Sequence, residues 1–305
     1  MASGNDQDTE TERRVSVMKV KKGVGERLFE MVNAFILAVL SLVMLYPFWH
    51  ELCLSFSSAT EATRGGVFLL PREFTMQAYQ LVTKNAFIWT SYANSIYTAV
   101  LTTGIGVLLT AMLAYGLSKK QVAGHRFLSF AVVFCMIFNG GLIPTYLTVK
   151  GLNLIDNLWA LILMAIVTPY NTIIVKNFFS AMPSELEEAA FIDGAGPLRI
   201  FFQIIMPLSK AVLATVGLWI AVASWNNFMG PLIYMNSREN FTLPLYIRQV
   251  IDGQMLARTT GEGAQSAVES VIGATIIISV APILCVYPFL QKYFVKGVMI
   301  GSVKG

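Results

Sequence analysis

Uncharged, strongly apolar stretches alternate with charged segments along most of this chain. Six such stretches contain no Asp, Glu, Lys or Arg, and they cover residues 31–50, 85–118, 127–149, 157–175, 211–237 and 270–291. A helix needs about 20 residues to cross a hydrocarbon core of about 30 Å. Backbone groups in lipid must be satisfied internally, and barrel strands are short and alternating, so the pattern favours helices. It predicts an all-α membrane protein with six transmembrane helices.

The segments around these stretches predict the domain organisation. Residues 1–27 are polar and rich in charge, which indicates a tail, and residues 292–305 form a second tail. The six-helix domain then occupies residues 28–291. The first stretch lacks a small-residue cleavage site and ends in aromatic residues, so it is a span and not a cleaved signal peptide. The long second stretch is expected to begin its span near Tyr92.

Two further segments outside the spans are long. Residues 51–90 contain turn residues followed by scattered apolar ones, which predicts a small folded cap. Residues 238–267 are long and polar and carry both charge signs, as a transient docking surface does, and we expect them to contact a soluble partner.

The distribution of Lys and Arg predicts the orientation. With the N-terminus in the cytoplasm, the inner segments hold 15 of the 22 Lys and Arg residues and the outer segments hold 7. Cytoplasmic segments normally carry this excess, so both termini are predicted to be cytoplasmic. The net charge of +4 follows from the same bias and implies no nucleic-acid partner.

Composition agrees with a membrane protein and argues against an enzyme. The chain is 55% hydrophobic and 13% charged, with a mean hydropathy of +0.61. It has no phosphate-binding GxxxxGK[ST] loop, and its two histidines, His50 and His125, lie at predicted membrane boundaries. The three cysteines are far apart and form no metal-binding pattern. We therefore expect no catalysis, metal or cofactor in this chain.

The spans also contain no ionisable side chain of the kind that proton- or sodium-coupled carriers use. Energy for transport would then enter from outside the membrane. A channel is the rival class, because a polar pore needs no coupling ion.

One predicted cytoplasmic segment, between the fourth and fifth stretches, is not a simple loop. Ser184 is followed three residues later by Glu187, the pattern of a capping box. Three glutamates over residues 185–188 place negative charge where the helix dipole favours it. A short helix is therefore predicted to start at Ser184.

The end of this helix and the start of the next are also marked. Gly194 can adopt a positive φ and end the first helix, and Pro197 suits the first turn of a second one that stops near Pro207. We call residues 184–206 the elbow. It is either an amphipathic helix on the lipid surface or a docking element for a soluble partner. Its acidic start argues against the first alternative, because the inner leaflet is negatively charged and would repel it.

The elbow resembles the EAA motif of ABC importer permeases: Glu-Ala-Ala, three residues, Gly, nine residues, Ile, one residue, Leu, Pro. The matching residues are Glu188, Ala189, Ala190, Asp193, Gly194, Ile204 and Pro207. Met206 replaces the usual Leu. Ala211 stands where the family often has proline, which predicts a less kinked start of the fifth span.

The resemblance extends over roughly residues 28–305. The six spans, the Trp225-Asn226-Asn227-Phe228 stretch and the C-terminal residues 293–305 are similar to the smaller permease of maltose-type carbohydrate importers, and most similar to oligosaccharide permeases of Gram-positive bacteria. The resemblance implies the type I importer permease fold in a bacterial cell membrane, with the elbow as a coupling helix.

The resemblance also implies the partners. They are a second, related permease in a heterodimer, two cytoplasmic ATPase subunits that bind ATP and Mg, and an extracytoplasmic sugar-binding protein. This chain would itself bind no cofactor, and its Glu188, Ala189, Ala190, Asp193, Gly194 and Pro207 would transmit ATPase motion to the membrane.

Trp225, Asn226 and Asn227 are the candidate pore residues. Amides and aromatic faces together bind neutral sugars, and this trio offers both. Polar residues within spans more often pack helix against helix, and the partner permease alone could hold the sugar.

Overall fold

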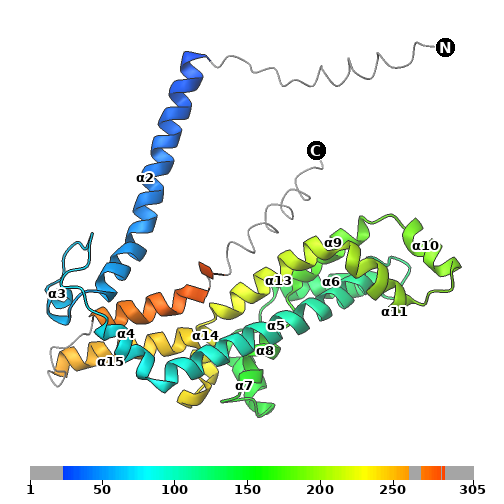
Figure 1. The fold of residues 1–305 in the computed structure, drawn as a ribbon. Coiled ribbons are helices and arrows are strands. Elements are labelled where there is room, and N and C mark those ends of the chain that lie inside the picture. The colour runs from blue at the N-terminus through cyan, green and yellow to red at the C-terminus, as the bar shows by residue number, and fades with distance from the viewer. Residues whose placement is uncertain (1–22, 261–268, 283, 286–305) are drawn as a thin grey trace. The chain divides into compact units, whose positions relative to one another are not determined.

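The computed structural model describes residues 23–260, 269–282 and 284–285, with only the backbone for residues 254–260. The chain divides into two units, residues 1–50 and 51–305. Every regular element in the described ranges is a helix, which confirms the all-α class (Figure 1). The first helix begins at Val24, inside the predicted tail 1–27. The predicted tail 292–305 lies outside the described residues.

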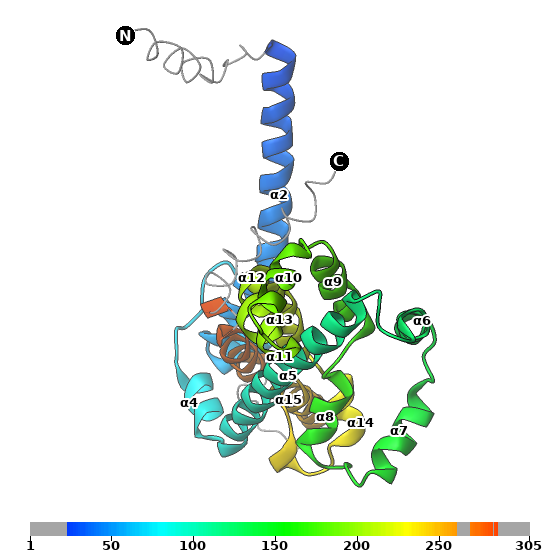
Figure 2. The ribbon, with the colours of Figure 1, turned by 90° about the vertical axis from the view of Figure 1, so that its right-hand side faces the viewer.

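Helix α2, Val24–Ser55, has 32 residues and is about 48 Å long at 1.5 Å per residue (Figure 2). Its most apolar window has a mean hydropathy of 2.3. Large apolar side chains are exposed along residues 28–49, with Met44 at 71% and Phe35 at 70%. A surface of this kind needs lipid or an apolar protein partner around it.

The segment after α2 is folded, as predicted. It contains α3, Ala59–Arg64, and α4, Gln77–Lys84. Phe68 is fully buried and forms a small core with Cys53, Leu54 and Ala62.

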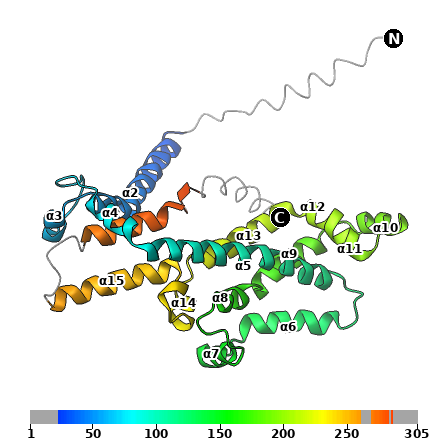
Figure 3. The same cartoon turned by 60° about the horizontal axis from the view of Figure 1, so that its bottom comes forward.

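Helix α5, Ala86–Ser118, is the central element of the second unit (Figure 3). It contacts α8 (Leu158–Ala165), α9 (Pro169–Ser180), α13 (Lys210–Trp225) and α15 (Leu243–Thr260). Between its ends, its buried face is made of small residues, including Ser95, Thr98 and Thr102. A Cβ atom on Gly106 would lie 2.6 Å from the carbonyl oxygen of Ile166. The backbones approach this closely only because position 106 has no side chain.

The third and fourth predicted spans are interrupted. Helix α6, His125–Ile137, meets α7, Leu142–Gly151, at an angle of 113°, and α8 meets α9 at 43°. Gly141, with φ +89°, precedes α7 and marks the first break. Pro169 opens α9 and marks the second, because proline has no N–H with which to continue the backbone hydrogen bonds of α8. Among the described residues, α2 and α5 are each long and apolar enough to cross a membrane, and the number reaches five at most if each bent pair forms one span.

The last part of the unit differs from the predicted pattern of one long span and one polar loop. The fifth stretch is broken, because α13 ends at Trp225 and α14 covers Met229–Tyr234. After the 3₁₀ turn η2, Arg238–Asn240, the predicted polar segment forms α15, whose Leu243 and Tyr246 are buried. The prediction of a loop missed these inward apolar residues, and residues 261–268 lie outside the described ranges. The predicted sixth span begins as the helix Glu269–Pro282.

Candidate functional site

The first helix of the elbow is α10, Glu185–Ile192, and its start differs from the predicted capping box. Ser184 lies in helical geometry, φ −68° and ψ −24°, and its hydroxyl makes no capping bond. Its carbonyl oxygen instead accepts the N–H groups of Glu187 and Glu188, both at 3.0 Å. A capping side chain needs an extended backbone at the cap, which Ser184 lacks.

Glu187 has a different partner from the one predicted. Its carboxylate pairs with the Lys119 ammonium at the end of α5 and accepts a hydrogen bond from the Tyr115 hydroxyl at 3.3 Å. Lys119 also lies over the Tyr115 ring, with its ammonium 4.7 Å from the ring centroid. The pair is largely screened from solvent, with side-chain exposures of 14% for Glu187 and 25% for Lys119. Sequence reasoning missed this tie between the elbow and α5, since the partners are 68 residues apart.

The reversal at Gly194 is confirmed. Gly194 has φ +79°, and its N–H donates to the Phe191 carbonyl at 3.0 Å. The next N–H, of Ala195, donates to the Ala190 carbonyl at 2.9 Å. This is a glycine-dependent helix end, and Pro197 then opens α11, Pro197–Ile200, as predicted.

The two faces of the elbow differ. Ala190 is buried with Ile200, Phe201 and Ile205 in one apolar core. The opposite side is exposed and includes the predicted residues Glu188, Ala189, Asp193 and Gly194. Large apolar side chains accompany them, with Ile192 87% and Leu198 67% exposed. Exposed apolar groups beside charges are typical of a protein contact surface.

Pro207 lies in the short segment that joins the elbow to α13. Helix α11 continues through a π-helical turn, Phe201–Ile205, into α12, Met206–Leu208. The combined segment then bends by 82° into α13. The expectation of a less kinked start of the fifth span, based on Ala211, is wrong. The bend falls at Ser209, whose φ of −99° and ψ of 11° leave the helical region, so it needs no proline at position 211.

The candidate pore residues lie at the break between α13 and α14. The Asn226 amide donates to the Val222 carbonyl at 2.9 Å, and the Asn227 amide oxygen accepts the Gly230 N–H at 3.1 Å. The Asn227 amide thus binds a backbone N–H at the start of α14, while the Asn226 amide adds a second bond to a carbonyl that already accepts the Asn226 backbone N–H at 3.0 Å. Trp225 is half-buried, with its ring centroid 6.4 Å from that of Tyr92. Asn226 is exposed, and Asn227 is half-buried like Trp225. Their role in a pore stays a prediction.

Residues 106–300 match the family described as binding-protein-dependent transport system inner membrane component. Protein LplC of Bacillus subtilis (strain 168) is 42% identical over 282 residues, which cover 92% of this chain and 96% of LplC. The polygalacturonan/rhamnogalacturonan transport system permease protein YtcP of the same organism is 39% identical, over 92% of this chain and 99% of YtcP.

A solved structure is similar as well. It is a chain of a bacterial ABC transporter involved in the import of the acidic polysaccharide alginate, with a TM-score of 0.82 and 33% identity. The match covers 90% of this chain and 99% of that chain. The chain described here belongs to the family of binding-protein-dependent transport system inner membrane components.

Proposed function

We propose that this chain is the transmembrane permease subunit of an ATP-driven importer that carries a sugar, of the oligosaccharide class, from an extracytoplasmic binding protein into the cytoplasm. Family membership supports the transport role. The transport role of YtcP and the role of the similar structure in alginate import support a carbohydrate as cargo. The fold likeness to that importer supports the type I permease architecture.

The arrangement in the membrane follows from the charge bias and the apolar helices. We place six spans in a bacterial cell membrane, with α2 first, α5 second, and the bent pairs α6–α7 and α8–α9 as the third and fourth. The fifth is α13 with α14, and the helix Glu269–Pro282 begins the sixth. Both termini and the elbow are cytoplasmic in this arrangement, because Lys119, Lys176 and Lys210 then lie inside.

The partners are a related permease, two cytoplasmic ATPase subunits that bind ATP and Mg, and the sugar-binding protein outside. The exposed apolar surface of α2 fits a contact with lipid and with the second permease. ATP hydrolysis then belongs to the partner subunits, and this chain catalyses no reaction.

The observation that carries the proposal is the outer face of the elbow. Ile192, Leu198 and Glu188 are all exposed, while the inner face is fixed by the apolar core around Ala190 and by Glu187. An exposed apolar surface that carries a carboxylate fits a cleft with a basic group on an ATPase subunit. The elbow is continuous with α12, which ends one residue before α13, so displacement of the docked elbow moves the fifth span.

The test is Glu188→Lys in the complete complex, reconstituted in liposomes. We expect loss of ATPase association or of sugar uptake, with the membrane part still assembled. Glu26→Lys makes the same charge change at an exposed site in the first turn of α2 and serves as the control. An elbow that only lies on the lipid surface predicts the opposite result, since added positive charge strengthens that contact and leaves transport intact.

Gly194→Val tests the geometry of the same element. A β-branched residue at φ +79° is strained, at a cost of roughly 1–2 kcal/mol, and misdirects α11. Gly124→Val is the matched control, because Gly124 has φ +78° and similarly open surroundings outside the elbow. Uptake lost in Gly194→Val and kept in Gly124→Val supports coupling through the elbow. Full uptake in both Glu188→Lys and Gly194→Val excludes it.

A further inference from the structure

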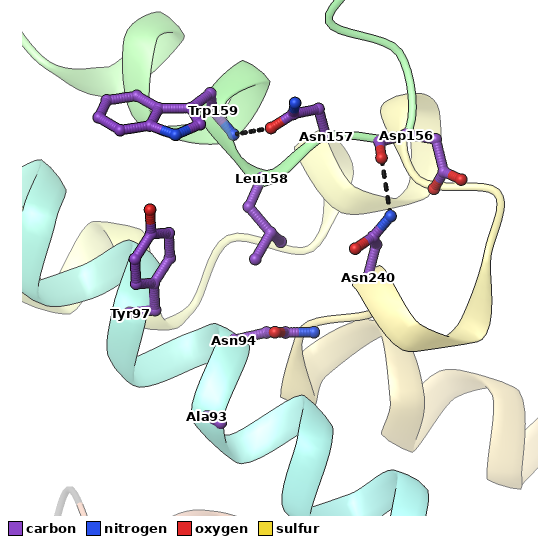
Figure 4. A pocket seen from close by; sticks show the side chains of 8 residues that line it. All are labelled: Ala93, Asn94, Tyr97, Asp156, Asn157, Leu158, Trp159 and Asn240. Carbon is purple, nitrogen blue, oxygen red and sulfur yellow. Dashed lines mark hydrogen bonds between the residues drawn. The ribbon is translucent and has the colours of Figure 1, made fainter.

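A pocket of about 580 Å³ lies where the start of α5, the start of α8 and η2 meet (Figure 4). In the proposed orientation these three elements lie on the outer side of the membrane. The pocket is separate from the break at Asn226 and Asn227, which does not line it. In Figure 4 the rings of Tyr97 and Trp159 lie on one side of it, and the amides of Asn94 and Asn240 lie on the other.

The three asparagines of the pocket are each held at one end of the amide. Asn94 donates its amide N–H groups to the carbonyls of Glu239 and Phe241, at 2.6 and 3.0 Å. The Asn240 amide donates to the Asp156 backbone carbonyl at 2.7 Å, and the Asn157 amide oxygen accepts the backbone N–H of Trp159 at 3.0 Å.

These backbone bonds orient the amides and leave the other end of each available. In the described part of the chain, the amide oxygens of Asn94 and Asn240 and the amide nitrogen of Asn157 bond to no other group. The pocket therefore presents two acceptors and one donor group in fixed positions.

The only carboxylate among the pocket-lining residues is already satisfied. Asp156 accepts the N–H groups of Asn236 and Ser237, at 2.9 and 3.0 Å, and also the Ser237 hydroxyl. These bonds, first that of the Ser237 hydroxyl, hold the pKa of the Asp156 carboxyl far below its ordinary value. The group thus stays charged and joins the start of α8 to the segment before η2. No lysine or arginine lines the pocket to receive an anionic ligand.

The rings complete the chemistry. Tyr97 is 42% and Trp159 38% exposed, and the Tyr97 hydroxyl bonds to no group in the described residues. An aromatic belt at the membrane surface would explain two such rings, but it would not require three amides fixed by backbone bonds around them. Amides that bind hydroxyl groups, beside rings that stack on C–H faces, are the groups that bind an uncharged sugar.

We propose that this pocket is a sugar-binding subsite that holds one neutral sugar unit on the outer side of the permease. The proposal rests on the proposed function and names the substrate class that this subsite accepts. A uronate is disfavoured here, because the pocket offers it the Asp156 charge and no cation.

The test uses the complete complex in a background without cysteines other than one introduced as Ala93→Cys. Ala93 is exposed and lines the pocket. The rate of labelling by an impermeant maleimide is measured with maltotriose and xylotriose as neutral probes and with digalacturonate as the acidic one, each at millimolar concentration. We expect at least one neutral probe to slow the labelling and digalacturonate to leave it unchanged.

Two variants make the test specific. Tyr97→Phe removes one hydroxyl, and Asn157→Asp keeps the helix cap but removes the free amide nitrogen. Each is expected to weaken protection about two- to ten-fold, the loss of one hydrogen bond. The matched controls are Tyr170→Phe, another exposed tyrosine, and Asn85→Asp, which also caps a helix by accepting an N–H at 3.0 Å. Both controls should retain protection within two-fold.

The outcomes separate this proposal from the proposed function. No protection by the neutral probes, equal protection by digalacturonate, or equal effects of variants and controls overturns the subsite. Sugar uptake and binding-protein-stimulated ATPase activity are measured on the same unlabelled complex. A complex that imports sugar while the introduced cysteine stays unprotected refutes the subsite alone, whereas a complex without ATP-driven uptake of any sugar refutes the proposed function.

Discussion

The ion pair between Glu187 and Lys119 offers a quantitative test of how the elbow is held. Exposed ion pairs contribute about 0.2–1 kcal/mol, and breaking a fully buried one costs about 3–5 kcal/mol. With side-chain exposures of 14% and 25%, this pair lies between these limits. Glu187→Gln removes the charge and leaves Tyr115 only a neutral amide oxygen as acceptor, so it is expected to cost about 1–3 kcal/mol in the docking of α10 on α5.

The direct measurement is amide hydrogen exchange over residues 185–192 in the detergent-solubilised complex. If α10 exchanges by local opening, a loss of about 1–3 kcal/mol speeds its exchange roughly 5- to 150-fold. Glu185→Gln is the matched control, because Glu185 is exposed and stands in the same first turn. It loses the same charge near the helix dipole but no ion pair.

A double-mutant cycle then isolates the pair. Lys119→Met and Glu187→Gln should each speed exchange, and the double variant should be no worse than the stronger single variant. Uptake per ATP hydrolysed should fall in the same order, since a loosened elbow passes less motion to α13. Additive effects, or equal exchange in Glu187→Gln and Glu185→Gln, would refute the reasoning.

Three further predictions concern other parts of the chain. Asn tolerates the positive φ at position 156, and Asp156→Asn should lower the free energy of unfolding by about 1–2 kcal/mol at neutral pH. Because the pKa of the Asp156 carboxyl is lowered in the folded state, the difference from wild type should hold above about pH 4 and shrink as the pH falls below it. Thermal melts at a series of pH values measure this difference. Gly106→Ala should reduce the melting temperature, because its Cβ meets the Ile166 carbonyl, whereas Gly104→Ala, with open space around it, should not. Impermeant maleimide on intact cells should label a cysteine at Arg72 but not one at Lys120, and labelling at Lys120 would reverse the proposed topology.

The sequence predicts helices and turns correctly where residues close together in the chain decide the local structure. The apolar stretches predicted helices, and the family model confirms a transport membrane component. Gly194 and Pro197 mark the reversal of the elbow correctly, because a positive φ and a first-turn proline are properties of single residues. Ser184 was misread, since whether a cap is used depends on the backbone angles that the preceding turn imposes.

Contacts between distant segments were decided by the tertiary structure alone. Glu187 fitted a local capping box equally well, and only the packing of α10 against α5 brings Lys119 to it. The pocket draws Asn94, Asn157 and Asn240 from three separate segments, and nothing in the sequence near any one of these asparagines points to the other two. Periodicity and capping involve groups within about four residues of each other, whereas these sites arise from helix packing, whose geometry depends on close approaches such as that at Gly106.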